Sequence, residues 1–391
     1  MKVFPVEDGV IIKSWCESPE EGALEQARNL ARLPFAFRQV CLMPDVHQGY
    51  GMPIGGVLAA GGAVIPDAVG VDIACGVAAM KLPISEIPTD KLKKLMGYIR
   101  ERIPLGFNRH KEPQDSAYMP VRTCDFTMGS SGVIEDQWDQ ALCQLGTLGG
   151  GNHFIEIQKG SDGYIWIMLH SGSRNLGKQV ADYWNKEAVE LNERWHSAVP
   201  REWQLAFLPL DSLEGEQYLD EMRFCVKFAE GNRRLMMDRI MDGVAELGIA
   251  AKSLLRIDVA HNYARMENHF GKNVMVHRKG ATSAKMGEVG IIPGSQGTAS
   301  YIVEGKGNLE SFQSCSHGAG RRMGRKAAIR TLDLETEKAR LDNQGILHSI
   351  RGNQDLDEAA GAYKDISVVM AEQSDLVDIL VELHPLAVIK G

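Results

Sequence analysis

The sequence predicts an α+β fold, with β-sheets flanked by helices, in one large domain over residues 1–391. Between Cys41 and Met80, short apolar runs alternate with glycine and proline, as in buried strands joined by tight turns. The stretch from Asp211 to Leu247 is the most helical of the chain. No repeat, low-complexity linker or change in composition divides the sequence. We therefore expect one integrated unit, without a separable second domain.

The N-terminal half contains several clear local patterns. Val10–Trp15 is predicted to be a short strand. Ser18-Pro19-Glu20-Glu21 predicts a helix start with Ser18 as the cap, and this helix should end near Arg32. Amphipathic spacing predicts further helices over Thr89–Ile103 and Glu135–Leu145.

The C-terminal half alternates strands with helices. A strand over Tyr164–Leu169 precedes a helix over Leu176–Trp195. The stretch Asp211–Leu247 forms one long helix, or two helices with a break near Gly231. The remaining predicted elements are strands over residues 254–260, 274–277 and 377–382, and helices over 321–330, 334–343 and 366–373.

The net charge and the cysteine content limit the classes of protein to which this chain can belong. The net charge is −8, so the surface as a whole should not attract nucleic acid, and a polyanion must bind at local basic patches. The odd cysteine count and the lack of a CxxC pair argue against a disulfide framework. No signal-peptide block or membrane-spanning apolar run is present, so we expect a soluble cytoplasmic protein. The seven cysteines are Cys16, Cys41, Cys75, Cys124, Cys143, Cys225 and Cys315.

The stretch from Gly307 to Arg325 combines an imidazole with features of an anion site. His317 is followed by small residues, which let a ligand approach the backbone. A helix starting near Ala319 would direct its free N–H groups toward the same place. The stretch also carries fixed positive charge on Arg321, Arg322 and Arg325. The alternative is a glycine-rich turn into a basic helix with a buried histidine.

Five further polar residues lie at predicted strand ends or glycine-rich turns and are candidate metal ligands. They are Asp72, Cys75, His153, His170 and His261. Each has a plainer interpretation, such as a hydrogen-bonded core histidine, a buried thiol or a turn carboxylate. If they bind metal, the ligand types alone favour zinc, cobalt or iron over manganese.

A second polar group lies beside glycine turns and indicates nucleotide binding. Its members are Asn152, Glu156, Asn262, Ser295 and Ser300, and each alone is equally typical of a turn or helix cap. The segments His170–Lys178 and His277–Thr282 carry basic residues that would grip phosphates or form solvated loops. Neither contains a Walker pattern.

With these residues in place, the sequence resembles the RtcB family of RNA ligases over nearly its whole length, from Pro44 to the C-terminal VIKG. The motifs, in family order, are GVDIACG, LGGGNHFIEI, LHSGSRNLG, HNYA, HRKGAT, IIPGSQGTASY and SHGAGR. The resemblance implies metal and guanylate sites in a central cleft. It also implies GTP- and manganese-dependent joining of an RNA 2′,3′-cyclic phosphate or 3′-phosphate end to a 5′-hydroxyl end, as in RNA repair or tRNA splicing.

Site roles follow from the same resemblance. His317 would be the nucleophile that carries GMP, and Asp45 would orient it. The five candidate ligands would hold a pair of manganese ions, which replaces the metal preference inferred from ligand type. The guanylate pocket would comprise Asn152, Phe154, Glu156, Asn262, Ser295, Ser300, Ala319, Gly320, Tyr363 and Lys390. Apart from the resemblance, Lys390 would be taken for part of a frayed tail.

Other functions remain open at this point. A metal-dependent phosphohydrolase or cyclic phosphodiesterase would use the metal ligands but not His317. Two further alternatives are a paralogue that guanylylates ends without sealing them and a paralogue that binds RNA ends without catalysis. Expected partners are RNA with broken ends and, by resemblance, an archease-type activator, with no membrane association. The oligomeric state expected is a monomer or a dimer.

Overall fold

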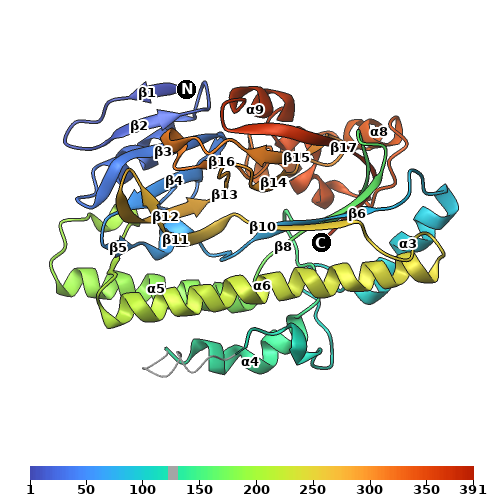
Figure 1. Cartoon of the computed structure of the whole chain (residues 1–391), viewed down its shortest axis with the longest axis horizontal. Helices are drawn as coiled ribbons and strands as arrows, with labels where there is room; N and C mark the ends of the chain where they lie inside the picture. The colour runs from blue at the N-terminus through green and yellow to red at the C-terminus, as the bar shows by residue number, and fades with distance from the viewer. Residues whose placement is uncertain (122–130) are drawn as a thin grey trace.

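The computed structural model describes residues 1–121 and 131–391. Two large β-sheets lie above a layer formed by long helices (Figure 1). One sheet has six strands in the order β1-β2-β3-β4-β12-β11, and the other has seven in the order β10-β6-β8-β7-β17-β15-β14. The edge strands β10 and β14 of the seven-stranded sheet approach each other, so this sheet is nearly closed. These mixed sheets and helices confirm the predicted α+β class.

The six-stranded sheet is antiparallel except for the parallel pair β2–β3. Its strands are β1 (Lys2–Phe4), β2 (Ile11–Ser14), β3 (Ala36–His47), β4 (Ile54–Ala60), β11 (Asn262–His269) and β12 (Lys272–Lys279). Most of β3 and β4 is buried on both faces, which explains why their sequence is apolar without strict alternation.

The seven-stranded sheet is antiparallel throughout. Its strands are β6 (Gly76–Leu82), β7 (Phe154–Gly160), β8 (Ile165–Ser171), β10 (Leu255–Ala260), β14 (Val289–Ile292), β15 (Ser300–Gly305) and β17 (Val377–Lys390). Two smaller pairs complete the strands: β13 (Ala281–Ser283) with β16 (Ser314–Ser316), and β5 (Ala63–Val64) with β9 (Leu208–Pro209).

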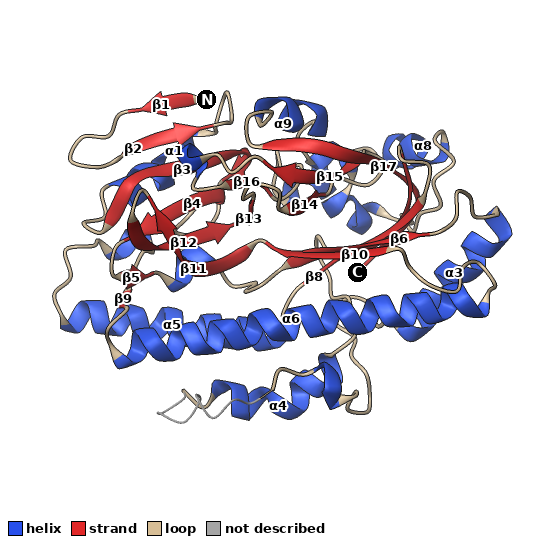
Figure 2. Cartoon of the chain, viewed as in Figure 1, coloured by secondary structure: helices blue, strands red, loops and turns tan. Residues whose placement is uncertain are grey.

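The helices lie mainly around the outside of the sheets (Figure 2). The α-helices are α1 (Glu21–Ala31), α2 (Pro66–Val69), α3 (Thr89–Arg102), α4 (Val133–Gln144), α5 (Arg174–Arg194), α6 (Leu213–Glu246), α7 (Arg325–Thr331), α8 (Leu334–Asp342) and α9 (Ile366–Glu372). Short 3₁₀ turns are η1 (Ser116–Tyr118), η3 (Arg201–Trp203), η4 (Leu309–Ser311), η5 (Asn353–Glu358) and η6 (Ala360–Ala362).

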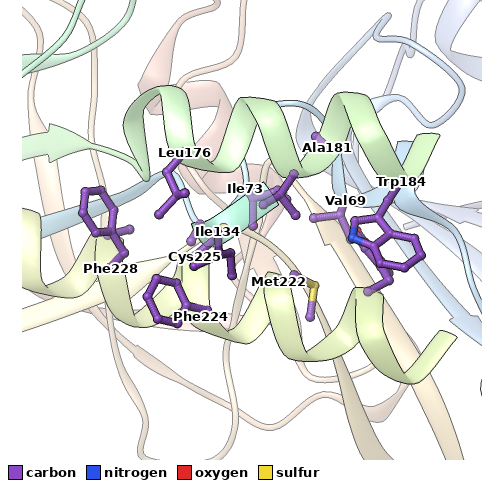
Figure 3. Close-up of a cluster of buried hydrophobic side chains, with 14 of the residues drawn as sticks. Val69, Ile73, Ile134, Leu176, Ala181, Trp184, Met222, Phe224, Cys225 and Phe228 are labelled. Atoms are coloured by element: carbon purple, nitrogen blue, oxygen red, sulfur yellow. The ribbon is translucent and has the colours of Figure 1, made fainter. Parts of the chain in front are cut away.

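The longest helix, α6, is continuous, so the predicted alternative of a break near Gly231 is wrong. It begins at the Ser212 cap, whose Oγ accepts a hydrogen bond of 3.0 Å from the Gly215 N–H. Gly231 serves packing, because a Cβ there would collide with the main-chain oxygen of Tyr118. Buried residues of α6, including Met222 and Phe228, pack against α5 (Figure 3).

The same core cluster anchors a segment that carries candidate ligands. Ile73 is fully buried in this cluster, between Asp72 and Cys75 in the chain (Figure 3). Burying an aliphatic side chain of this size contributes roughly 1.5–3 kcal/mol. The packing therefore fixes the backbone from which both ligand candidates project.

Several local predictions need correction. Helix α1 begins at Glu21, so Ser18 is not its cap, and the N-cap residue Glu20 makes no side-chain cap bond. No helix starts near Ala319, because the chain forms a turn there and α7 begins only at Arg325. Strand β17 is longer than predicted and runs to Lys390. Cys124 lies outside the described residues, while the six other cysteines are free thiols.

Candidate active site

A short hydrogen bond joins His317 to Asp45. His317 follows β16, and Asp45 lies in β3, so the pair links distant parts of the chain. The distance from His317 Nδ1 to Asp45 Oδ2 is 2.7 Å, and the same oxygen accepts bonds from the backbone N–H groups of His317 at 3.1 Å and Gly318 at 3.3 Å. With Nδ1 as donor, Nε2 of His317 keeps a free lone pair.

Asp45 is suited to hold that imidazole. Its side chain is fully buried. Burial by itself raises the pKa of Asp45, but His317 and Lys364 more than offset this and hold the pKa below the usual value. The carboxylate is therefore charged at neutral pH and accepts a hydrogen bond from the Nδ1–H of His317. Asp45 also accepts through its main-chain oxygen from His47 Nδ1, at 3.0 Å.

The five candidate metal ligands converge in one buried cluster. Cys75 Sγ lies 3.1 Å from His170 Nε2 and 3.4 Å from His153 Nε2. His170 Nε2 lies 3.3 Å from His261 Nε2, and His153 Nε2 lies 3.4 Å from Asp72 Oδ2. The donor atoms form two groups of three that share Cys75: Cys75, His170 and His261, and Asp72, Cys75 and His153.

The two sheets meet at this cluster. Cys75 immediately precedes β6, His170 lies within β8, and His153 immediately precedes β7. His261 is the single residue between β10 of one sheet and β11 of the other. The prediction that His170 lies at a strand end is correct to within one residue, because β8 ends at Ser171.

The donor set fits a transition-metal site. Nδ1 of His153 lies 2.8 Å from the main-chain oxygen of Leu148, so Nδ1 donates there and Nε2 presents its lone pair to the cluster. Burial holds the pKa values of His170 and His261 well below normal, which favours the neutral form that binds metals. Burial raises the pKa of Asp72, but bonding to His153 and Cys75 lowers it overall to about 2. A carboxylate, a thiol and three imidazoles could thus hold a divalent ion pair that shares the sulfur.

His317 stands directly beside this cluster. The ring centroids of His317 and His261 are 4.7 Å apart, and those of His261 and His170 are 5.0 Å apart. A group attached to Nε2 of His317 would therefore lie close to any ion held by the cluster.

His317 also lines a pocket of about 180 Å³. Eight of the ten predicted guanylate residues line it: Asn152, Phe154, Glu156, Ser295, Ala319, Gly320, Tyr363 and Lys390. His170 also lines the pocket, so the pocket and the donor cluster are adjacent. His317 therefore lines the pocket and also lies next to the candidate metal-ligand cluster.

The two other predicted guanylate residues contact protein backbone instead. Asn262 donates to the main-chain oxygen of Asp72 at 2.9 Å and accepts from the Gly280 N–H at 2.8 Å. Ser300 Oγ accepts from the Gly294 N–H at 3.0 Å. Neither lines the pocket, so both support its walls in this structure.

Lys390 reaches the pocket because β17 continues almost to the C-terminus. It pairs with Phe154 of β7, and its Nζ lies 5.8 Å from the centroid of the Phe154 ring. The alternative of a frayed tail is therefore wrong. Burial lowers the pKa of Lys390, while it raises that of Glu156 to about 8, so the pocket holds Glu156 in its neutral form near pH 7.

Sequence reasoning assigned no site role to Glu358 or Gln296, and it noted His47 only as a polar residue among buried strands. Glu358 accepts from Arg321 Nη1 at 2.8 Å and from Arg325 Nε at 2.6 Å, and it also bonds the Tyr363 hydroxyl. It is almost completely buried and positions all three side chains. The only available signal was a carboxylate within the small-residue run EAAGAY.

The structure treats the two segments that were predicted to bind phosphates differently. In His277–Thr282 the basic residues are buried and already bonded: Arg278 pairs with Glu267, and Lys279 donates to main-chain oxygens of Tyr50 and Asp67. That segment is therefore not a solvated loop, and its basic side chains are not available to bind a phosphate. In His170–Lys178, by contrast, Arg174 lies against the donor cluster, with Nη1 3.4 Å from His153 Nδ1.

A family model described as tRNA-splicing ligase RtcB matches residues 26–391. The chain belongs to the RtcB family. The RtcB proteins it resembles include the RNA-splicing ligase RtcB of Escherichia coli, 36% identical over 407 residues that cover 97% of each chain. The tRNA-splicing ligase RtcB of Thermococcus kodakarensis is 31% identical, over 95% of this chain and 92% of its own. The RNA-splicing ligase RtcB of Mycobacterium tuberculosis is 32% identical, over 94% of this chain and 100% of its own.

Family membership agrees with the candidate site, because every motif named above except HRKGAT contributes a residue to the pocket or the donor cluster. Among the described residues, no helix combines the length and the apolar character needed to cross a bilayer.

Proposed function

We propose that this RtcB-family chain is a GTP- and Mn²⁺-dependent RNA ligase of the cytoplasm. It would join RNA ends bearing a 2′,3′-cyclic phosphate or 3′-phosphate to ends bearing a 5′-hydroxyl. The observation that carries this proposal is the position of His317. Its Nδ1 is hydrogen-bonded to Asp45, and its ring lines the pocket and lies next to His261 of the donor cluster. Relatives named RNA-splicing ligases support the reaction class.

In this mechanism Nε2 of His317 attacks the α-phosphorus of GTP. A nitrogen–phosphorus bond forms, the bond to the bridging oxygen breaks, and pyrophosphate leaves. Asp45 holds the Nδ1 proton and stabilises the positive charge that develops on the imidazole. Where the RNA carries a 2′,3′-cyclic phosphate, water first adds to phosphorus and the bond to the 2′-oxygen breaks, which leaves a 3′-phosphate. The guanylyl group then passes from His317 to the RNA 3′-phosphate, and the 5′-hydroxyl oxygen displaces GMP.

The pocket residues would bind and orient the guanylate. Glu156 and Lys390 offer hydrogen-bonding groups in a largely buried recess, and Phe154 provides an aromatic surface. Arg321 and Arg325, aligned by Glu358, place positive charge beside His317 where phosphates would lie. Asp72, Cys75, His153, His170 and His261 would hold the Mn²⁺ ions, which when bound supply Lewis acidity at phosphate oxygens.

The deciding experiment is intact-mass spectrometry after incubation with GTP and MnCl₂. The wild type should gain the mass of one GMP, and His317→Ala should gain none. His348→Ala is a matched control, because His348 lies outside the pocket and should leave the adduct intact. If the metal-loaded wild type acquires no adduct but hydrolyses a 2′,3′-cyclic phosphate, the ligase mechanism is overturned in favour of a phosphodiesterase.

A further inference from the structure

Phe107 is a fully exposed aromatic side chain close to the candidate site. It lies in the loop of residues 103–115, which connects α3 to η1. Within the described part of the chain it has no aromatic or cation–π partner. Single exposed apolar residues are common, so exposure alone indicates no function. Three further features of this loop indicate that Phe107 has a role in binding.

The first feature is a fixed backbone. The Gly106 N–H donates to the Gly149 oxygen at 2.9 Å, and the Leu148 N–H donates to the Pro104 oxygen at 3.0 Å. On the far side of the loop, the His110 N–H donates to the Cys143 oxygen at 3.0 Å. Hydrogen bonds therefore hold the loop on both sides of the exposed Phe107. A ligand that binds this side chain would not have to order the loop first.

The second feature is continuity with the candidate site. Gly149 opens the run of glycines that leads to Asn152 in the pocket and His153 in the donor cluster. The C-terminal residue Gly391, next to Lys390, donates from its N–H to the His153 oxygen at 3.3 Å and closely approaches Gly149. The Phe107 loop thus borders the glycine-rich segment that supplies Asn152 to the pocket and His153 to the donor cluster.

The third feature is charge. Arg109 and Lys111 are exposed on the same loop, and neither forms an ion pair within residues 1–121 and 131–391. The acidic residues of the loop are Glu112 and Asp115, and Asp115 accepts a hydrogen bond from the Ala117 N–H. Because the whole chain is negatively charged, free cations beside the site are where a polyanion would be held.

We propose that Phe107, Arg109 and Lys111 form a binding surface for the single-stranded end of the RNA. A base stacks on the Phe107 ring, and the two cations contact backbone phosphates, which is the combination that single-stranded nucleic acids require. This inference rests on the proposed function, which supplies the RNA substrate. The surface is where the RNA strand would leave the candidate active site. It binds the strand without regard to sequence, since every base offers a stacking face.

The test combines RNA binding with the RNA-independent guanylylation of His317. The probe is a labelled ten-nucleotide RNA with a 3′-phosphate, titrated by fluorescence anisotropy. Phe107→Ala should raise the Kd about tenfold, while Phe107→Tyr should bind like the wild type, because stacking is retained. The matched control Met286→Ala, at another exposed apolar residue outside the pocket, should leave the Kd unchanged.

Charge is tested by the double variant Arg109→Gln, Lys111→Gln. It should reduce the slope of log Kd against log salt by about 1.4, since each single-strand phosphate contact contributes about 0.7. All variants should form the GMP adduct at the wild-type rate. An unchanged Kd in Phe107→Ala overturns the proposal and points to a protein as the occupant of this surface. If instead the wild type forms no adduct but Phe107 still controls RNA binding, the proposed function fails and this surface stands.

Discussion

Lys364 brackets Asp45 through its Nζ, which donates to the main-chain oxygens of Pro44 at 3.1 Å and Val46 at 2.6 Å. The backbone N–H of Lys364 also donates to the Gly320 oxygen at 2.9 Å, in the turn that follows His317. One lysine therefore ties the strand carrying Asp45 to the turn carrying its partner imidazole. Its charge also favours the ionised form of Asp45.

Replacing Lys364 with methionine should slow catalysis without weakening nucleotide binding. The variant keeps the aliphatic part of the side chain but loses the hydrogen bonds to the Pro44 and Val46 oxygens, which position Asp45. The rate of GMP-adduct formation should therefore fall about tenfold while the KM for GTP stays the same. Stopped-time mass spectrometry over a GTP series measures both values. Lys306→Met is the control, since Lys306 also donates to a main-chain oxygen but lies outside the pocket. A raised KM with an unchanged maximal rate would contradict the positioning role.

Asp45→Asn should lower the rate of adduct formation by about 100-fold or more. The neutral amide cannot stabilise the charged imidazole, and it can hold His317 in the wrong tautomer. The same mass measurement checks this, with Asp333→Asn as a control, because an asparagine caps a helix as well as the aspartate of α8 does. A variant that reacts at the wild-type rate would show that Asp45 does not assist His317.

Metal binding should stabilise the fold through the donor cluster. At a Mn²⁺ concentration of 100 Kd the stabilisation is about 2.7 kcal/mol, which a chelator should remove as a fall in Tm. Cys75→Ala should abolish the Tm difference between chelated and Mn²⁺-loaded protein, because Cys75 belongs to both ligand groups. Cys143→Ala should preserve that difference. An equal shift in both variants would place the metal elsewhere.

His277 should make the protein lose stability in mild acid. It is fully buried, its Nε2 accepts from the Ile65 N–H at 3.0 Å, and burial lowers its pKa from 6.5 to about 4. Between these values the unfolded chain binds the proton and the folded chain does not, so stability falls as the pH drops from 6.5 to 4. The contribution lost is about 3 kcal/mol at 1.36 kcal/mol per pKa unit.

Urea unfolding across this pH range measures the effect. In His277→Gln the amide oxygen can accept the same bond without titrating, so the variant should lose less free energy of unfolding than the wild type between pH 6.5 and 4. Parallel curves for the two proteins would exclude His277 as the titrating group.

Arg278→Met should destabilise the chain by about 3–5 kcal/mol, because it leaves Glu267 as a buried charge without its guanidinium partner. Arg278 Nη1 lies 2.6 Å from Glu267 Oε1, and both side chains are buried. The double variant Arg278→Met, Glu267→Gln should recover part of the loss, since it removes the unpaired charge. Chemical denaturation of the two variants provides the comparison, and equal losses would argue that packing rather than charge explains the effect.

Most secondary structure and the donor cluster were predictable from the sequence. Apolar runs and helical spacing are local properties, so β2, α3, α4, α8 and the length of α6 follow from nearest neighbours along the chain. The candidate ligands stood out because polar residues interrupt buried segments, and the structure does bring Asp72, Cys75, His153, His170 and His261 together.

By itself, then, the amino-acid sequence determined the α+β class, the family and the residues capable of the chemistry. Only the tertiary structure decided how they are supported. Lys364 holds the strand that carries Asp45, and Glu358 holds Arg321 and Arg325. Asn262 bonds to backbone, and Arg278 is buried against Glu267. The physical reason is that these are contacts between separate strands and loops. Whether a charged side chain meets solvent or a partner depends on chain segments as far apart as Pro44 and Lys364, which no local pattern specifies.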